Sequence, residues 1–251
     1  MTLRYLLWDV DGTLADTERD GHRVAFNMAF EEAGLARRWD EAVYGELLAV
    51  TGGKERIRHD IARGDMPPMD DEDIARLHAR KTELYQELIA SGRIPLRPGV
   101  RRILEEAHAA GVTLGVATTT TPAALEALIA HSLGPEWFDR FAVLAAGDIV
   151  PAKKPAPDIY LHAMEAMGAR PEETLAMEDS ANGWKAARDA GLRCVVTVNG
   201  YTRGQDFAGA DLVVSDLGEP DGPAIEVLAN PHGLDDLHHV ELAHLRAIME
   251  D

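Results

Sequence analysis

The sequence has little cysteine and far fewer basic residues than acidic ones. Its 251 residues include one cysteine, which excludes an internal disulfide and any zinc site built from several cysteines. Lysine and arginine number 25 against 43 aspartates and glutamates, so the formal net charge is −18. This charge argues against nucleic acids and anionic membranes as partners, because both are negatively charged themselves. An anionic substrate would need a local cationic pocket or a metal ion.

Long hydrophobic runs are also missing. No stretch approaches 18 consecutive apolar residues, so the sequence predicts no membrane span. The N-terminus leads directly into a strand pattern, without a basic segment followed by a signal-type apolar segment. We therefore expect a cytoplasmic protein, and we expect it to be a monomer. The single cysteine, Cys194, lies in an apolar run and is interpreted as a buried, inert thiol.

A short apolar run near the N-terminus ends at two carboxylates. Residues 6–8, Leu-Leu-Trp, read as a buried strand, Asp9 and Asp11 follow, and Gly12 permits a sharp turn. Open α/β sheets bind their ligands at such strand ends. The two carboxylates would repel each other unless a cation or a shared proton intervened, and Mg²⁺ suits carboxylates combined with a phosphate. The alternative is a strand followed by an acidic turn, with Asp9 as a helix cap.

The chain divides by pattern into a helical insertion and an alternating part. Residues 18–91 show only helical spacing of apolar residues, interrupted at Met66-Pro67-Pro68. We interpret them as a small all-helical cap inserted into a catalytic core that comprises residues 1–17 and 92–220. The alternative is that these helices belong to one mixed domain.

Strand and helix patterns alternate from residue 98 onwards. Five further strand-like runs are expected, at residues 112–117, 142–146, 175–177, 194–198 and 212–214. This order predicts an α/β fold with a doubly wound, Rossmann-like parallel sheet. Residues 221–251 form an acidic tail that shows no strand pattern and one amphipathic helix pattern.

Four of the predicted strands end in groups that suit phosphoryl transfer. They are followed by Asp9 and Asp11, by Thr118, by Lys154 in a Lys-Pro-Ala-Pro-Asp loop, and by Glu178 and Asp179. A carboxylate such as Asp9 can attack phosphorus only if cations offset the repulsion between anions. Asp11 could then protonate the departing oxygen. Thr118 could instead be a helix cap, and Lys153 competes with Lys154 for the role of the cation.

These motifs resemble the haloacid dehalogenase (HAD) superfamily of aspartate-nucleophile phosphatases and phosphomutases, over about residues 3–214. The resemblance implies that Asp9 is the nucleophile and Asp11 the general acid/base. It also implies that Thr118 binds the transferred phosphate and that Lys154 is the catalytic lysine.

The same resemblance implies Mg²⁺ as the cofactor. The implied metal site comprises Asp9, Asp11 through its carbonyl, Asp179, and Glu178 acting through water. A dehalogenase needs neither this metal nor a second acidic pair, so dehalogenase activity is disfavoured.

The helical insertion resembles the cap of the β-phosphoglucomutase and CbbY-type branch. Residues 51–56, Thr-Gly-Gly-Lys-Glu-Arg, stand where that branch carries a glycine-rich basic loop that reaches the substrate. Glycine lets backbone N–H groups approach a phosphate, and an arginine can bind it bidentately. The alternative is a helix start with solvated basic residues. The substrate-binding residues implied by the resemblance are Glu18, His22, Tyr44, Gly52, Gly53, Lys54, Arg56, Lys81, Thr119 and Arg203.

The resemblance implies a Mg²⁺-dependent phosphatase that acts on a sugar phosphate or bisphosphate through an aspartyl-phosphate on Asp9. Members of the CbbY-type group hydrolyse sugar bisphosphates, notably xylulose 1,5-bisphosphate, an inhibitor of the carbon-fixing enzyme Rubisco. A β-phosphoglucomutase-like phosphomutase remains an alternative, because it uses the same four strand ends, as does a phosphatase for another small ester such as phosphoglycolate. A non-catalytic phosphosugar sensor would be expected to have lost Asp9 or Asp11, and both are present.

Overall fold

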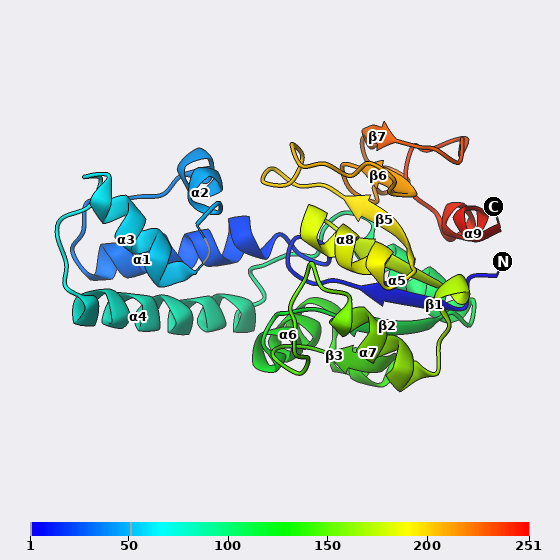
Figure 1. The fold of residues 1–251 in the computed structure, drawn as a ribbon, viewed down its shortest axis with the longest axis horizontal. Coiled ribbons are helices and arrows are strands. Elements are labelled where there is room, and N and C mark those ends of the chain that lie inside the picture. Colours follow the sequence, from blue (N-terminus) through cyan, green and yellow to red (C-terminus); the bar gives the residue numbers. More distant parts are fainter. Residues whose placement is uncertain (1, 51, 251) are drawn as a thin grey trace. The chain divides into compact units, whose positions relative to one another are not determined.

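The computed structural model describes residues 2–50 and 52–250, which form two compact units (Figure 1). Unit 1 comprises Met1–Asp16 and Pro95–Asp251, and unit 2 comprises Thr17–Ile94. The predicted cap, residues 18–91, falls within unit 2, and the predicted tail, residues 221–251, belongs to unit 1. Thr51, the first residue of the predicted glycine-rich loop, lies outside the described residues. In the part of the chain that is described, no helix is both long and apolar enough to cross a membrane.

Unit 1 contains a seven-stranded sheet in the order β3-β2-β1-β4-β5-β6-β7. The strands are β1 (Tyr5–Trp8), β2 (Thr113–Ala117), β3 (Phe141–Ala145), β4 (Thr174–Glu178), β5 (Arg193–Thr197), β6 (Leu212–Val214) and β7 (Val227–Ala229). The first six pair in parallel. The order reverses around β1, which lies between β2 and β4, so β1 is the point at which such folds bind their ligands. The predicted doubly wound α/β fold is confirmed.

The strand β7 was not expected from the sequence. Residues 227–229 pair antiparallel with β6, so the prediction of no strand after residue 221 is wrong. Three residues are too few to show the alternating pattern that predicts a strand, and two of them, Val227 and Leu228, remain 39% and 38% exposed.

Helices of unit 1 alternate with its strands. They are α5 (Val100–Ala109), α6 (Pro122–Leu128), α7 (Asp158–Met167), α8 (Ala181–Asp189) and α9 (Leu242–Glu250), with single turns at Ile129–Leu133, Pro135–Asp139 and Pro171–Glu173. In α5 the residues at positions 100, 103, 104 and 107 are buried, the spacing of one helical face. Helices α7 and α8 pack together around Leu7 and Ala176 on one face of the sheet. Cys194, in β5, belongs to this core and is 1% exposed.

The regular elements in the described part of unit 2 are all helices, as predicted. Its elements are a π-helical turn (η1, Glu18–His22), α1 (Arg23–Glu32), α2 (Glu41–Leu47), α3 (Gly53–Ala62) and α4 (Asp71–Ala90). Helix α1 packs along α4. The side chains of Asp40 and Asp70 cap α2 and α4, respectively, by accepting hydrogen bonds from backbone N–H groups of the first turn.

A buried aspartate links the aromatic core of unit 2 to the neighbouring loop. Asp60 is fully buried, accepts two hydrogen bonds from Arg37, at 2.7 and 2.9 Å, and accepts a third from the indole N–H of Trp39 at 2.7 Å. The Trp39 ring packs against Phe26 and Phe30. These three hydrogen bonds hold the loop before α2 against α3.

Candidate active site

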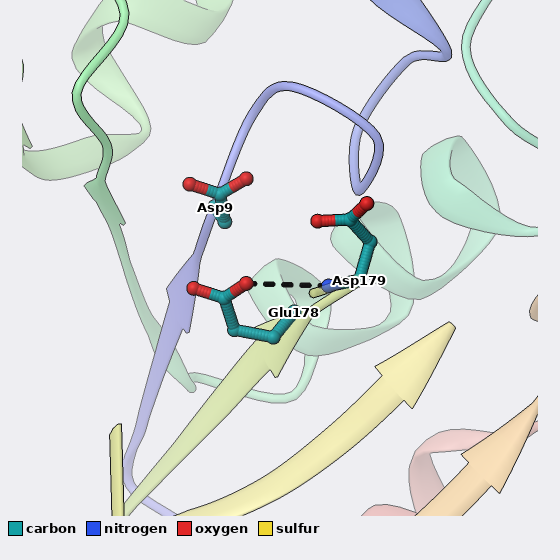
Figure 2. A group of neighbouring side chains, drawn as sticks. All are labelled: Asp9, Glu178 and Asp179. Atoms are coloured by element: carbon teal, nitrogen blue, oxygen red, sulfur yellow. Dashed lines mark hydrogen bonds between the residues drawn. The ribbon is translucent and has the colours of Figure 1, made fainter. Parts of the chain in front are cut away.

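Three carboxylates meet at the carboxyl ends of the neighbouring strands β1 and β4 (Figure 2). Asp9 follows β1, Glu178 ends β4, and Asp179 comes next. The backbone N–H of Asp9 donates to the carbonyl of Met177 at 3.0 Å, which continues the pairing of the two strands up to the site. One carboxylate oxygen from each acid lies within 4.8 Å of the others, and all three side chains are buried.

Burial and nearby negative charge raise the pKa values of two of these acids, Asp9 and Asp179. Burial raises the pKa of Asp9 to about 7, Lys154 opposes this increase, and Glu178 adds to it. Burial likewise raises the pKa of Asp179 well above its usual range, and the charges of Asp9 and Glu178 raise it further. A divalent cation would relieve this repulsion, and carboxylate oxygens are the ligands that Mg²⁺ prefers. The residues present therefore fit Mg²⁺, whereas a role for the Asp11 carbonyl as a ligand stays a prediction.

Lys154 provides a positive charge at the centre of this cluster. Its Nζ donates to Asp9 Oδ1 at 2.6 Å, to Glu178 Oε1 at 2.6 Å and to the carbonyl of Ala117 at 3.0 Å. These acceptors match the three N–H groups of an ammonium. Burial alone would lower the pKa of Lys154, but Asp9 and Glu178 outweigh it and raise the pKa above its usual range. The side chain is therefore a fixed cation in direct contact with the predicted nucleophile.

Glu178 accepts hydrogen bonds from several neighbouring groups. Its Oε1 also accepts a hydrogen bond from the Tyr160 hydroxyl at 2.6 Å, and its Oε2 accepts one from the Asp179 N–H at 3.2 Å. A Cβ at Gly183 would lie 1.8 Å from Oε2, so α8 approaches this carboxylate too closely for any side chain there. Glu178 thus anchors Lys154. Sequence reasoning missed Tyr160, although its hydroxyl on the buried face of the helix after the lysine loop was a usable signal.

A row of hydroxyl groups connects the end of β2 to Asp11. Thr118 Oγ1 lies 3.0 Å from Thr120 Oγ1, which in turn donates to Asp11 Oδ2. Both threonines are buried, whereas Thr119, predicted to bind substrate, is exposed. Thr120 was missed because four consecutive threonines give no indication of which ones face the site.

The turn after Asp11 packs directly on Asp179. Gly12 has a φ of +88°, a conformation that favours glycine, and a Cβ there would lie 2.2 Å from Asp179 Oδ2. Both the backbone conformation and the close contact therefore disfavour a side chain at this position. The amide of Asn199 donates to the same carboxylate oxygen at 2.7 Å. Asn199, in the loop after β5, is a further residue that the sequence did not indicate.

In unit 2, three predicted substrate-binding residues form a chain of hydrogen bonds. The hydroxyl of the fully buried Tyr44 donates to Glu18 Oε2 at 2.6 Å and accepts from Arg56 Nη1 at 3.2 Å. Arg56 Nε also donates to the carbonyl of Val50 at 3.0 Å. The guanidinium is thus oriented by its surroundings before any ligand binds.

A second group in unit 2 surrounds Lys81. The Lys81 Nζ lies 2.8 Å from His22 Nδ1 and 4.7 Å from the centre of the Phe26 ring, and the His22 ring stacks on Tyr85 at 3.8 Å. A Cβ at Gly53 would lie 2.4 Å from His78 Nε2, one turn of α4 before Lys81. A side chain at position 53 would therefore require the His78 ring to move.

Two other predicted substrate-binding cations, Lys54 and Arg203, belong to neither of these two groups. Lys54, on the first turn of α3, is exposed. Arg203, in unit 1, forms an ion pair with Glu226 near β7 at the sheet edge, with its side chain 45% exposed. Gly52 precedes α3 with a φ of +98°, a conformation that favours glycine.

The sheet topology and this centre define an α/β enzyme whose chemistry is organised around a buried aspartate beside a fixed lysine. The chain belongs to the haloacid dehalogenase-like hydrolase family, whose match spans residues 3–191. This confirms the predicted family and the predicted hydrolase class.

Individual relatives agree with this family. The chain is 49% identical over 218 residues to Protein CbbY of Rhodobacter capsulatus, covering 86% of this chain and 95% of that protein. It is 44% identical over 222 residues to a CBBY-like protein of Arabidopsis thaliana, covering 86% and 69%, respectively. A crystal structure of CbbY from Rhodobacter sphaeroides in complex with xylulose-(1,5)bisphosphate is 45% identical, with a TM-score of 0.73 and coverage of 88% of this chain and 97% of that one. The predicted resemblance to the CbbY-type branch is confirmed.

Proposed function

We propose that the protein is a phosphatase that hydrolyses a sugar bisphosphate, specifically xylulose 1,5-bisphosphate, through an aspartyl-phosphate on Asp9. The observation that supports this proposal is the contact of Asp9 with Lys154 at 2.6 Å, beside the acidic pair of β4. The proposed substrate is the ligand of the CbbY crystal structure to which this chain is 45% identical.

In the proposed first step, a carboxylate oxygen of Asp9 forms a bond to phosphorus, and the bond from phosphorus to the sugar oxygen breaks. Asp11 gives its proton to the departing sugar oxygen. In the second step, Asp11 takes a proton from water as the water oxygen attacks phosphorus, which releases inorganic phosphate and restores Asp9. A hydroxyl from the row of Thr118 and Thr120 would donate to the transferred phosphate.

Lys154 would neutralise the negative charge of the phosphate next to the nucleophile, while Glu178 and Tyr160 keep its ammonium in place. Asp9 and Asp179, supported by Glu178, would hold Mg²⁺, which supplies further positive charge to the transferred group. Preorganised charges of this kind lower the barrier without rearrangement during the reaction.

We further propose that the second phosphate of the substrate binds to the basic side chains of unit 2. Arg56 is oriented by Tyr44, and Lys81 lies between His22 and Phe26. Without such cations, a second phosphate would add two negative charges to a protein whose formal charge is already −18.

The proposal is tested by measuring phosphate release from purified protein with Mg²⁺ across a panel of sugar mono- and bisphosphates. The expected result is a preference for xylulose 1,5-bisphosphate. The same mixtures are analysed for isomeric sugar phosphates, because a phosphomutase would return the phosphate to another oxygen. Isomerisation without net phosphate release would contradict the phosphatase proposal.

A further inference from the structure

Arg97 holds the turn that follows Asp11, although no sequence motif indicated it. Its backbone N–H donates to the carbonyl of Leu14 at 2.9 Å, and its Nη1 donates to the carbonyl of Gly12. The preceding residue, Leu96, bridges to Ala15 in antiparallel fashion. The segment before α5 is therefore attached to the turn by both backbone and side chain.

The same guanidinium is attached to the far side of the site. Nη1 also donates to the carbonyl of Thr197 at 2.7 Å, and Nη2 donates to the carbonyls of Val198 and Ser215, both at 2.6 Å. Thr197 ends β5, Val198 follows it, and Ser215 follows β6. A planar fork with five N–H donors can satisfy acceptors in several directions at once, and lysine cannot.

Arg97 connects parts of the sheet that are not adjacent. Strand β4 lies between β1 and β5, so Arg97 links the turn after β1 to strands beyond β4. Asp179 follows β4, and the positive charge of Arg97 acts on it. The turn carries Asp11 on one side and rests on Asp179 on the other.

We propose that Arg97 is a positioning residue that fixes the Asp11 turn for proton donation to the leaving group. This inference rests on the proposed phosphatase function. Asp11 is held at its carboxylate by Thr120, and the next peptide unit is held by Arg97. Loss of the second attachment misplaces the acid, whereas Asp9 and Lys154 keep their direct contact.

The test is Arg97→Gln and Arg97→Lys, assayed for the first chemical step with two phosphate esters. A sugar phosphate has a poor leaving group that needs a proton, whereas 4-nitrophenyl phosphate releases 4-nitrophenolate, which is stable as an anion and leaves without a proton. General acid catalysis contributes roughly 100- to 10,000-fold, so partial misplacement should slow the step about 10- to 100-fold for the sugar phosphate. With the aryl ester we expect a loss of less than about 3-fold, and KM for the sugar phosphate should change by less than about 3-fold. Lysine should fail to rescue.

Arg102 is the matched control. It is also an arginine of unit 1 that donates to backbone carbonyls, those of Gly218 at 2.9 Å and Val240 at 2.8 Å, but it serves the C-terminal segment. Arg102→Gln should lower the melting temperature and leave the first step unchanged for both esters. Equal losses for both esters in Arg97→Gln would overturn the proposal, since a merely structural role does not depend on the leaving group.

Hydrogen exchange separates the failure of this inference from the failure of the proposed function. Arg97→Gln should speed exchange of the backbone amides in residues 12–15 at least about tenfold, and Arg102→Gln should not. Unchanged exchange in Arg97→Gln would overturn the proposal that Arg97 holds the turn, even if phosphatase activity is present. Inactivity of the unmodified protein on every ester would refute the function, and the exchange data would still decide whether Arg97 holds the turn.

Discussion

The hydroxyl of Tyr160 donates a hydrogen bond to Oε1 of Glu178, the same oxygen that Lys154 contacts, and both distances are 2.6 Å. Burial raises the pKa of Tyr160 well above its usual range, so this hydroxyl keeps its proton and acts as a donor. One buried helix residue thereby supports the acid that fixes the Lys154 ammonium.

We expect Tyr160→Phe to reduce stability and turnover together. Removing a donor from a buried carboxylate costs about 1–3 kcal/mol. Looser placement of Lys154 should lower kcat by about tenfold, with a smaller change in KM. Denaturant unfolding and steady-state kinetics measure both. Tyr5→Phe, at the opposite end of β1 from Asp9, is the control that should leave kcat unchanged.

Asp9→Asn should abolish turnover while the fold remains. The amide preserves the shape of the side chain but is no nucleophile, so activity should fall below about one-thousandth of the original. Circular dichroism checks the fold, and mass spectrometry of acid-quenched protein should detect the phosphoryl adduct in the unmodified chain alone. Activity above that level in Asp9→Asn would refute the covalent mechanism.

The metal-free protein should lose stability as the pH rises. Asp9 has a pKa of 3.8 in an unperturbed setting and about 7 here, so the folded state binds its proton more tightly. That contribution is present below about pH 4 and is lost as the pH rises through about 7, and Asp179 shifts in the same direction. Thermal melting in EDTA from about pH 5 to about pH 8 measures the trend. Asp9→Asn should flatten it, and an unchanged slope would contradict the assignment.

Chelation should abolish activity, and Mg²⁺ should restore it. Asp179→Ala should raise the Mg²⁺ concentration needed for half-maximal activity about 10-fold or more, because one of the clustered carboxylates is lost. The shift in melting temperature on adding Mg²⁺ provides a readout independent of turnover. Full activity in EDTA would refute the metal assignment.

Arg56→Ala should affect substrates that carry two phosphates. Loss of one charged contact to the distal phosphate should cost about 2–4 kcal/mol, or roughly 30- to 1,000-fold in kcat/KM. A small monophosphate ester should lose little. Arg58→Ala, on the same helix but paired with Asp71 at 2.8 Å on the surface, is the control. An equal loss on both substrates would show that Arg56 does not recognise the second phosphate.

The sequence predicted the parts of this site that depend on strand ends. Asp9, Thr118 and Glu178 each follow or end a buried strand, and parallel strands bring their carboxyl ends to one edge of the sheet. Periodicity and motif spacing are local signals, so they were sufficient for the fold class and for the core carboxylates.

The missed residues act through contacts between distant parts of the chain. Arg97 and Ser215 are 118 residues apart, and Thr120 and Asp11 are 109 residues apart. Such hydrogen bonds leave no periodic pattern in the sequence. Arg203 was predicted to bind substrate, and the structure shows it paired with Glu226, so its role in substrate binding stays a prediction.

Because Cys194 is buried, its reaction with a thiol reagent can report when the sheet of unit 1 opens. This sole sulfhydryl lies in β5, is 1% exposed, and burial raises its pKa well above the usual range. The folded protein therefore presents almost no thiolate to alkylating or oxidising reagents. Modification of this sulfur requires the sheet of unit 1 to open. The labelling rate under non-denaturing conditions therefore measures how often the sheet opens. Substrate or Mg²⁺ that stabilises the strand ends should lower the rate of Cys194 labelling.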